Sequence, residues 1–142
     1  MRKSLYMKIL VPIDGSEYSE KALFHACDIA KNYRANLVLL YVVEKSLPIN
    51  LLDRKEYLEI LRKFGNNILI KGKKITNDKG VDSKIIIKEG NIANEIIKLA
   101  KNEKCNLIVV GSKGLGSTAR FFLGSVSNKL VNNSPCSILI IK

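Results

Sequence analysis

Short hydrophobic runs alternate along the chain with longer segments in which hydrophobic residues recur every three or four positions. The runs at 8–13, 36–43, 84–88, 106–110 and 137–141 are rich in β-branched residues and predict five strands. The run at 36–43 is hydrophobic nearly throughout, as expected of a strand that is covered on both faces. The run at 84–88 is short, and we expect its strand to lie nearer an edge of the sheet.

Helices are predicted between these strands. Ser16 is the expected N-cap of a first helix, whose first turn contains Glu17 and Glu20. Asn91 is the expected N-cap of a later helix, and a last helix is expected from about residue 125 to residue 132. The hydrophobic residues expected on the inner sides of these helices are Ala22, Ala26, Ile29, Ala30, Tyr33, Ile92, Ile96, Leu99, Ala100, Val126, Leu130 and Val131.

The residue pattern of segment 47–80 predicts one long surface helix, broken or weakened near Gly65 and Gly72. A lid over a binding site is the alternative for this segment. The residues expected to point inward from it are Leu58, Leu61, Ile68 and Ile75.

Strands that alternate with helices predict an α/β fold with a parallel sheet and helices on both faces, in one domain over residues 1–142. Right-handed crossovers limit the topology, and the order 3-2-1-4-5 of a doubly wound, Rossmann-like sheet fits five strands. In this order strands 1 and 4 are neighbours and their connections leave to opposite faces. The place where the connections change sides is called the topological switch point. Such sheets bind ligands there, beyond the carboxyl ends of the strands.

Composition narrows the function classes. Hydrophobic residues make up 46% of the 142 residues, enough for a folded core. The net charge of +11 suggests nucleic acid, but the lysines are spread along the chain and there is no Trp, so a solvated basic surface is the preferred interpretation. Three cysteines and one histidine, His25, favour packing thiols and a helix-surface histidine over a zinc cluster or a disulfide framework.

The expected location is the cytoplasm. No hydrophobic run approaches the roughly 20 residues of a membrane span. The basic start, Met1 to Met7, is not followed by the hydrophobic stretch and cleavage site of a signal peptide.

Two glycine-containing segments are expected to meet at the switch point. Residues 12–16, PIDGS, leave strand 1, and residues 111–114, GSKG, leave strand 4. Glycines let a ligand approach backbone amides, which form anion-binding nests, and a helix that begins at Gly124-Ser125 favours an anion at its N-terminus. After Glu103 the chain has no Asp or Glu. These features together predict a phosphate-binding site.

Two familiar phosphate motifs do not fit this region. A P-loop requires Lys-Ser or Lys-Thr after a glycine at a spacing that is not found here. Residues 114–119, GLGSTA, match G-x-G-x-x-A, but a dinucleotide fold also requires an acid about 20 residues later, and none exists.

A third pattern, Gly111-x2-Gly114-x9-Gly124-Ser125, is complete. With KILVPIDGSEYSEKAL, LLYVV, LIVVGSKG, LGSVSNKLV and SPCSILIIK in this order, the chain resembles the universal stress protein family, of the single-domain UspA type. The resemblance covers essentially the whole chain, and ATP-binding members of the family carry G-x2-G-x9-G-[ST].

The resemblance implies a role for each matched position. Asp14 corresponds to an aspartate near adenine and ribose, which in some members lies near a metal ion, Mg²⁺ or Mn²⁺. Ile13 and Val42 correspond to adenine contacts, and Lys113 stands where members often have His or Arg. The complete set expected to bind ATP, ADP or AMP is Pro12, Ile13, Asp14, Val42, Val110, Gly111, Ser112, Lys113, Gly114, Gly124, Ser125, Val126 and Ser127. From the residues themselves, Asp14 also fits a simpler role as a turn or cap residue.

The resemblance also implies a partner. The final strand, 136–142, corresponds to the strand that pairs antiparallel across a two-fold axis in family dimers. An exposed hydrophobic edge strand would be prone to aggregation, so a second copy is a physically reasonable partner.

The expected function is therefore an ATP-binding, homodimeric stress-response module. The alternatives are an enzyme that slowly hydrolyses ATP or phosphorylates itself, and a nucleic-acid-binding protein. Hydrolysis needs an activated water and charge stabilisation, and the sequence offers one carboxylate at the site, Asp14, without a clear general base. That shortage favours binding over turnover.

Overall fold

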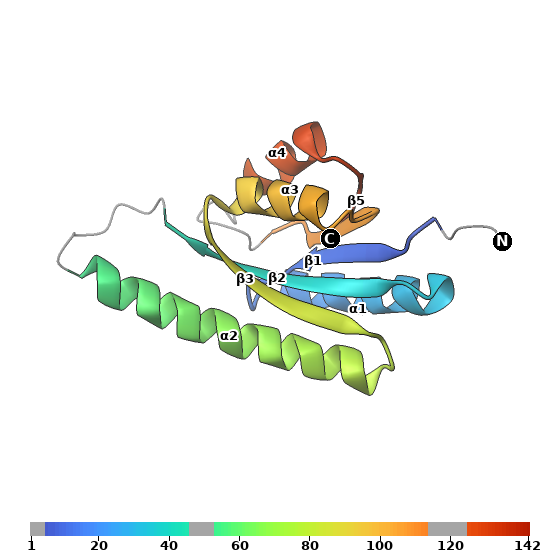
Figure 1. Cartoon of the computed structure of the whole chain (residues 1–142), viewed down its shortest axis with the longest axis horizontal. Coiled ribbons are helices and arrows are strands. Elements are labelled where there is room, and N and C mark those ends of the chain that lie inside the picture. Colours follow the sequence, from blue (N-terminus) through green and yellow to red (C-terminus); the bar gives the residue numbers. More distant parts are fainter. Residues whose placement is uncertain (1–4, 46–52, 114–124) are drawn as a thin grey trace.

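The computed structural model describes residues 5–45, 53–113 and 125–142 (Figure 1). The elements in chain order are β1 (Lys8–Pro12), α1 (Glu17–Tyr33), β2 (Asn36–Glu44), α2 (Arg54–Asp78), β3 (Ser83–Gly90), α3 (Ile92–Asn102), β4 (Leu107–Gly111), α4 (Ser125–Asn133) and β5 (Ser137–Ile141). The five strands are parallel and lie in the order β3-β2-β1-β4-β5. The predicted fold class and strand order are confirmed.

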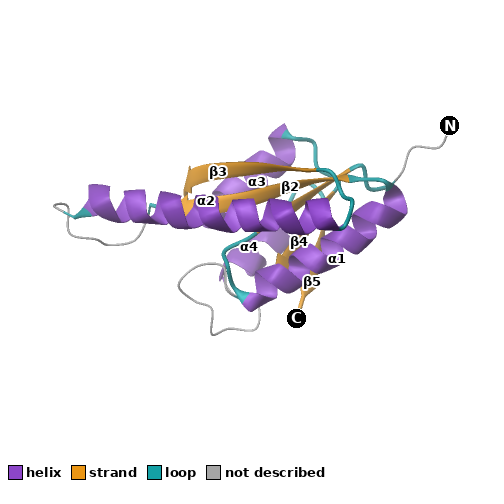
Figure 2. Ribbon diagram, turned by 90° about the horizontal axis from the view of Figure 1, so that it is seen from below, coloured by secondary structure: helices purple, strands orange, loops and turns teal. Residues whose placement is uncertain are grey.

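Two helices cover each face of the sheet (Figures 1 and 2). Alternate side chains of a strand point to opposite faces, so Ile9 and Val11 of β1 pack with α1 and α2, while Leu10 packs with α3 and α4. These three side chains are fully buried. A central strand that is buried on both sides requires a continuous hydrophobic run, which is why the alternation usual in half-exposed strands is missing from β1 and β2.

Both predicted N-caps are present. The Ser16 side chain accepts a hydrogen bond from the Ser19 amide at 3.2 Å, and the Asn91 side chain accepts one from the Asn94 amide at 3.0 Å. The predicted inward positions are right at most sites, but Tyr33 at the end of α1 is 37% exposed and Val131 is 53% exposed, so these two predictions were wrong. Helix α4 is short, and Val126 and Leu130 already fill its buried stripe.

Helix α2 runs without interruption through both glycines, so the predicted break near Gly65 and Gly72 was wrong. A Cβ on Gly65 would lie 2.3 Å from Cδ1 of Tyr41 on β2, and a Cβ on Gly72 would lie 3.1 Å from Cδ1 of Ile13. The glycines therefore let the helix lie close against the sheet. The helix also buries Leu69, which is not among the residues expected to point inward.

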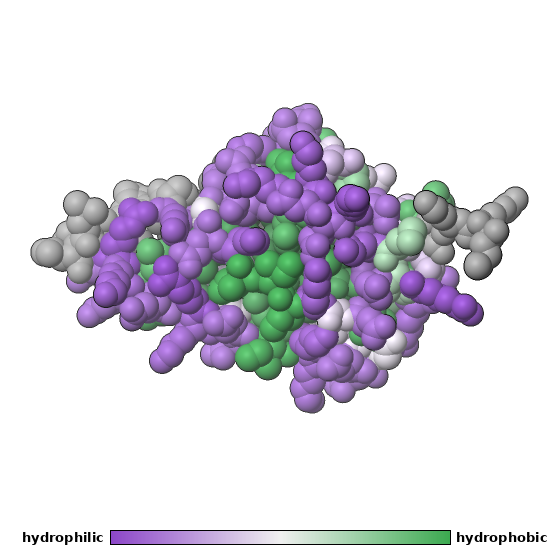
Figure 3. Space-filling view, viewed as in Figure 1, coloured by the Kyte–Doolittle hydropathy of each residue, from purple (hydrophilic) through white to green (hydrophobic). Residues whose placement is uncertain are grey.

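The edges of the sheet are β3 and β5, and the prediction of an edge position for strand 3 is confirmed. Figure 3 shows hydrophobic side chains gathered over β3 and the adjoining part of α2. The exposed large hydrophobic residues of these two elements include Ile85 and Ile70. Within 5–45, 53–113 and 125–142, the structure contains no helix with the length and hydrophobicity of a membrane span.

Candidate functional site

The carboxyl ends of the central strands β1 and β4 lie side by side. Leu10 pairs with Ile108, and this register continued by two residues brings Pro12 beside Val110. Helix α1 follows β1 on one face, and α4 follows β4 on the other face. The predicted switch point is therefore present, and the predicted residues 12–14 and 110–113 lie next to each other at the carboxyl ends of these two strands.

The loop from β1 to α1 is held by its own side chains. The Ser16 amide donates to Oδ1 of Asp14 at 2.9 Å, and the Asp14 amide donates to Oγ of Ser19 at 3.3 Å. Gly15 between them has a φ of +86°, which favours glycine. The turn role considered for Asp14 is therefore real, and it leaves Oδ2 of this half-buried carboxylate outside that hydrogen bond.

Asp14 lies near Tyr41 as well. Burial and the charge of Asp14 raise the pKa of the Tyr41 phenol, with burial the larger cause. Tyr41 is buried in the core next to α2. The loop that carries Asp14 thus borders the α1 and α2 face of the sheet.

The end of β4 is buried and its backbone is partly engaged. The Ser112 amide donates to the carbonyl of Ile141 at 2.8 Å, which continues the pairing of β4 with β5. Ser112 is 2% exposed. A phosphate contact from Ser112 would therefore have to use another atom than the amide nitrogen.

Lys113 lies toward α1. Its Nζ is 5.6 Å from the ring centroid of Tyr18, and Nζ of Lys21 lies 5.5 Å from the same ring. Cation–π contacts of this kind are weak, so they leave the half-buried Lys113 side chain able to turn toward an anion.

Helix α4 begins at Ser125, as predicted. Ser125 is exposed, whereas Val126 and Ser127 are buried beneath it. First-turn amides of a helix have no acceptor within the helix and favour an anion. Gly114 and Gly124 lie outside the described residues, so the expected convergence of the two glycine loops stays a prediction.

A cavity of about 160 Å³ lies beside this helix start. Its lining consists of Glu44, Asn91, Ile92, Ala93, Ser125, Val126 and Lys129. The cavity lies between the end of β2 and the N-termini of α3 and α4. Val42, a predicted adenine contact, lies two residues before Glu44 on β2. Glu44 and Lys129 were missed as candidates because they are separated by more than 80 residues, a span over which spacing carries no signal.

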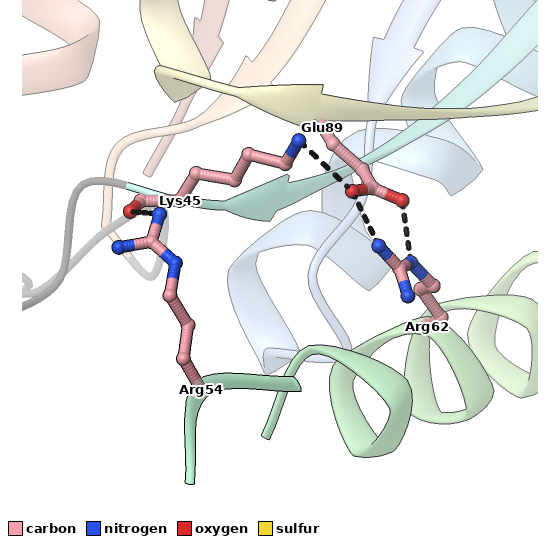
Figure 4. Close-up of polar contacts among 4 residues, drawn as sticks. All are labelled: Lys45, Arg54, Arg62 and Glu89. Atoms are coloured by element: carbon pink, nitrogen blue, oxygen red, sulfur yellow. Dashed lines mark hydrogen bonds and ion pairs between the residues drawn. The ribbon is translucent and has the colours of Figure 1, made fainter. Parts of the chain in front are cut away.

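An ionic cluster ties the ends of β2 and β3 to α2 (Figure 4). Arg62 donates from Nε and Nη2 to the two carboxylate oxygens of Glu89, at 2.5 and 2.8 Å. Nζ of Lys45 lies 3.4 Å from Oε1 of Glu89, and Arg54 donates to the Lys45 carbonyl at 3.0 Å. The hydrogen bonds from Arg62 are the main cause that lowers the pKa of Glu89 to about 2. The cluster therefore links α2 to the carboxyl ends of β2 and β3.

Asp14 is the carboxylate predicted for a metal ion. Among the residues that the structure describes, no group of three His, Cys, Asp or Glu side chains is placed to hold a metal. Mg²⁺ commonly binds through one or two carboxylates together with substrate phosphates and water. Asp14 fits that mode, in which most ligands come from the nucleotide and the solvent.

The cysteines and the histidine have the structural roles expected of them. Burial raises the pKa of Cys105 to about 11, so its thiol is neutral at physiological pH. Cys27 is also buried, and His25 is exposed on α1.

Comparison with known sequences gives full-length matches. The model of the Universal stress protein family matches residues 5–142. A universal stress protein of Methanocaldococcus jannaschii is 36% identical over 99% of this chain and 84% of its own length. The universal stress protein YxiE of Bacillus subtilis is 35% identical over 97% of this chain and 100% of its own length.

Solved structures match over similar lengths. Universal stress protein UspA from Lactobacillus plantarum has a TM-score of 0.87 at 28% identity, covering 96% of this chain and 98% of that one. A universal stress protein in complex with cAMP has a TM-score of 0.76 at 26% identity, covering 98% and 99%. An Arabidopsis thaliana family protein with AMP bound shares the fold, with a TM-score of 0.72 at 21% identity over 96% and 91%.

Proposed function

The chain belongs to the universal stress protein family, and from that premise we propose that it binds ATP at the carboxyl ends of its parallel strands. The observation that supports this proposal is the cavity at the start of α4, where Ser125 and Val126 line a space together with Glu44 at the end of β2. A family member of the same fold, 26% identical, was solved in complex with cAMP. An adenine nucleotide is therefore the ligand class to test first.

Each end of the nucleotide has suitable groups. The half-buried Val42 offers hydrophobic surface for the adenine ring, the buried Ile13 would contact it through its backbone, and Asp14 offers a carboxylate oxygen for ribose or a metal ion. The first turn of α4, with Val126 and Ser127, suits the phosphates. Lys129, one turn further along α4 in the adjoining cavity, adds a positive charge.

We further propose a nucleotide-responsive homodimer in the cytoplasm, formed by one domain that pairs through residues 136–142. Strand β5 is an edge strand, and Leu139 on it is 36% exposed. Pairing with a second copy would satisfy its outer row of backbone hydrogen-bonding groups. Slow ATP hydrolysis is the alternative activity, and it requires a base that activates water.

Native mass spectrometry of the purified full chain tests both parts. We expect a dimer mass and an adenine nucleotide retained in stoichiometric amount, or taken up when ATP is added. Titration calorimetry with ATP, ADP and AMP then ranks the nucleotides. Absence of uptake at millimolar ATP would refute nucleotide binding, and a monomer mass at micromolar protein would refute the dimer.

A matched pair of variants locates the site. Gly114→Val places a bulky side chain where backbone amides are proposed to meet phosphate, and we expect it to abolish ATP uptake. Gly80→Ala is the control, because Gly80 precedes β3 at the amino ends of the strands and a Cβ there meets nothing within 4 Å. Circular dichroism of both variants verifies folding.

A further inference from the structure

A second cavity of about 160 Å³ lies between α1 and α2, on the face of the sheet opposite to α3 and α4. Figure 2 shows these two helices side by side on that face. Leu23 of α1 forms one wall, and Ile68 and Ile75 of α2, seven positions apart, form the other. Ile13, which follows β1, closes the inner end.

The lining of this cavity is mostly hydrophobic. Ile13 and Leu23 are 5% and 2% exposed, and Phe64 is 51% exposed. The Phe64 ring packs edge-on against Tyr41, with centroids 6.2 Å apart and planes at 72°. A large aromatic side chain that lines a cavity and is still half exposed has ring surface left for another apolar group.

Polar groups of the lining give little support to a charged ligand. The Ser19 hydroxyl already accepts from the Asp14 amide and donates to the Ser16 carbonyl at 3.1 Å. Glu20 and Lys71 are exposed and carry opposite charges, so neither sign of ligand is favoured. The chemistry of the walls therefore selects for a neutral molecule.

We propose that this cavity is a binding site for a small, neutral aromatic molecule of about one ring. An enclosed engineered cavity of 150 Å³ lined by Leu, Ile and Phe in another protein binds benzene, so one aromatic ring matches the volume and the apolar lining of this more open cavity. The cavity shares Ile13 with the proposed nucleotide site, but Val42 and Val126 of that site pack on the other face of the sheet. It adds a second ligand, and its existence does not depend on nucleotide binding.

The probe for this site is 4-fluorophenol added to the full chain. Its ¹⁹F signal should shift and broaden saturably. In ¹⁵N-resolved spectra, the amides of Leu23, Ile68 and Ile75 should shift, while those of Val126 and Lys129 stay unchanged. Unsaturable binding, or shifts centred on α3 and α4, would overturn the proposal.

Two tryptophan variants test the location. Ile75→Trp fills the cavity, and we expect probe affinity to fall by about tenfold or more. Ile70→Trp is the control on the same helix, since Ile70 is 60% exposed and lies outside the cavity lining, and affinity should stay within about twofold. The natural chain has no Trp, so fluorescence reports whether each indole is buried. Equal affinities in two folded variants would contradict the proposal.

A second pair of variants, both to alanine, keeps the test valid if Ile75→Trp does not fold. Phe64→Ala removes the half-exposed ring and should weaken the probe by about threefold or more, whereas Ile60→Ala, one turn away and 64% exposed, should not. Repeating the titration with saturating ATP separates the two sites. Displacement of the probe by ATP would show one shared site and overturn the proposal, whatever the outcome for nucleotide binding.

Discussion

Gly111 at the end of β4 lies directly against Tyr18 in the first turn of α1. A Cβ on Gly111 would be 2.8 Å from the carbonyl carbon, the carbonyl oxygen and the Cβ of Tyr18. Real Cβ contacts essentially never reach this distance, so the backbone of α1 fixes the residue type here. The glycine that the family pattern assigns to a nucleotide turn is thus also required by helix-to-strand packing.

We therefore predict that Gly111→Ala destabilises the fold, with or without nucleotide. The added methyl group meets backbone atoms that cannot move aside by a rotamer change, and we expect a loss of about 3 kcal/mol in the free energy of unfolding. Urea denaturation of the nucleotide-free protein measures this loss directly.

Gly80→Ala is the comparison for that measurement. Gly80 has a φ of +72° with open space around it, so an alanine there costs only the left-handed conformation, about 1 kcal/mol. A Gly111→Ala loss no larger than that of Gly80→Ala would show that α1 can move away from β4 at little cost.

The strand order was predictable because burial on both faces of a strand requires a continuous hydrophobic run, which is visible in the sequence. Strands β1 and β2 had to be continuous hydrophobic runs, and right-handed crossovers then left few topologies. The N-caps at Ser16 and Asn91 were predictable for a similar reason, since a cap is a contact between residues three positions apart.

Contacts between distant residues were not predictable. When only residues nearby in sequence are considered, a glycine in a helix indicates a weak point. Gly65 is instead required because a side chain there would clash with Tyr41, 24 residues earlier on β2. Glu89 and Arg62 are 27 residues apart and belong to different elements. For the candidate site, the sequence indicated the switch point and Asp14, but not that the Ser112 amide is already bonded to Ile141.

Gly65 provides a second test of close packing. Gly65→Ala would place a Cβ 2.3 Å from the Tyr41 ring, and we expect a loss of about 3 kcal/mol. The ring is a side chain, so shortening it should relieve the clash. The double variant Gly65→Ala/Tyr41→Leu should be destabilised by less than the sum of the two single losses, as thermal or urea unfolding of all four proteins would reveal. Simple additivity would contradict the contact.

Glu89 gives a prediction about pH. Its pKa is about 2 in the folded protein against an ordinary value of 4.5, so the folded state favours the charged carboxylate. This contribution to stability is fully present above about pH 4.5 and is lost as the pH falls toward 2. We expect Glu89→Gln to lower stability by about 1 kcal/mol at neutral pH, and the difference from wild type to shrink through that acidic range.

The control for Glu89 is a pair with weaker geometry. Lys74 and Asp78 on α2 are 3.8 Å apart, with side chains 79% and 68% exposed. Asp78→Asn should change stability by no more than about 0.5 kcal/mol at neutral pH. If Glu89→Gln behaves like Asp78→Asn in denaturant titrations across the pH range, the bidentate ion pair between Arg62 and Glu89 does not stabilise the fold in solution.

The last prediction separates the two roles of Asp14 and rests on the proposed function. Asp14→Asn keeps Oδ1 as an acceptor for the Ser16 amide, so the turn should persist and stability should change by no more than about 0.5 kcal/mol. It removes the charge that would attract Mg²⁺, so the gain in ATP affinity on adding Mg²⁺ should disappear. Asp14→Ala loses the turn as well and should cost about 1 kcal/mol.

Calorimetric titration with ATP, in Mg²⁺ and in EDTA, checks this. Metal-free affinity of Asp14→Asn should equal or exceed that of wild type, because a negative charge near the phosphates is gone. A Mg²⁺-dependent gain that survives in the asparagine variant would mean that Asp14 only holds the turn. The metal ion would then be bound by the phosphates without this carboxylate, and the loop would serve to position Ile13.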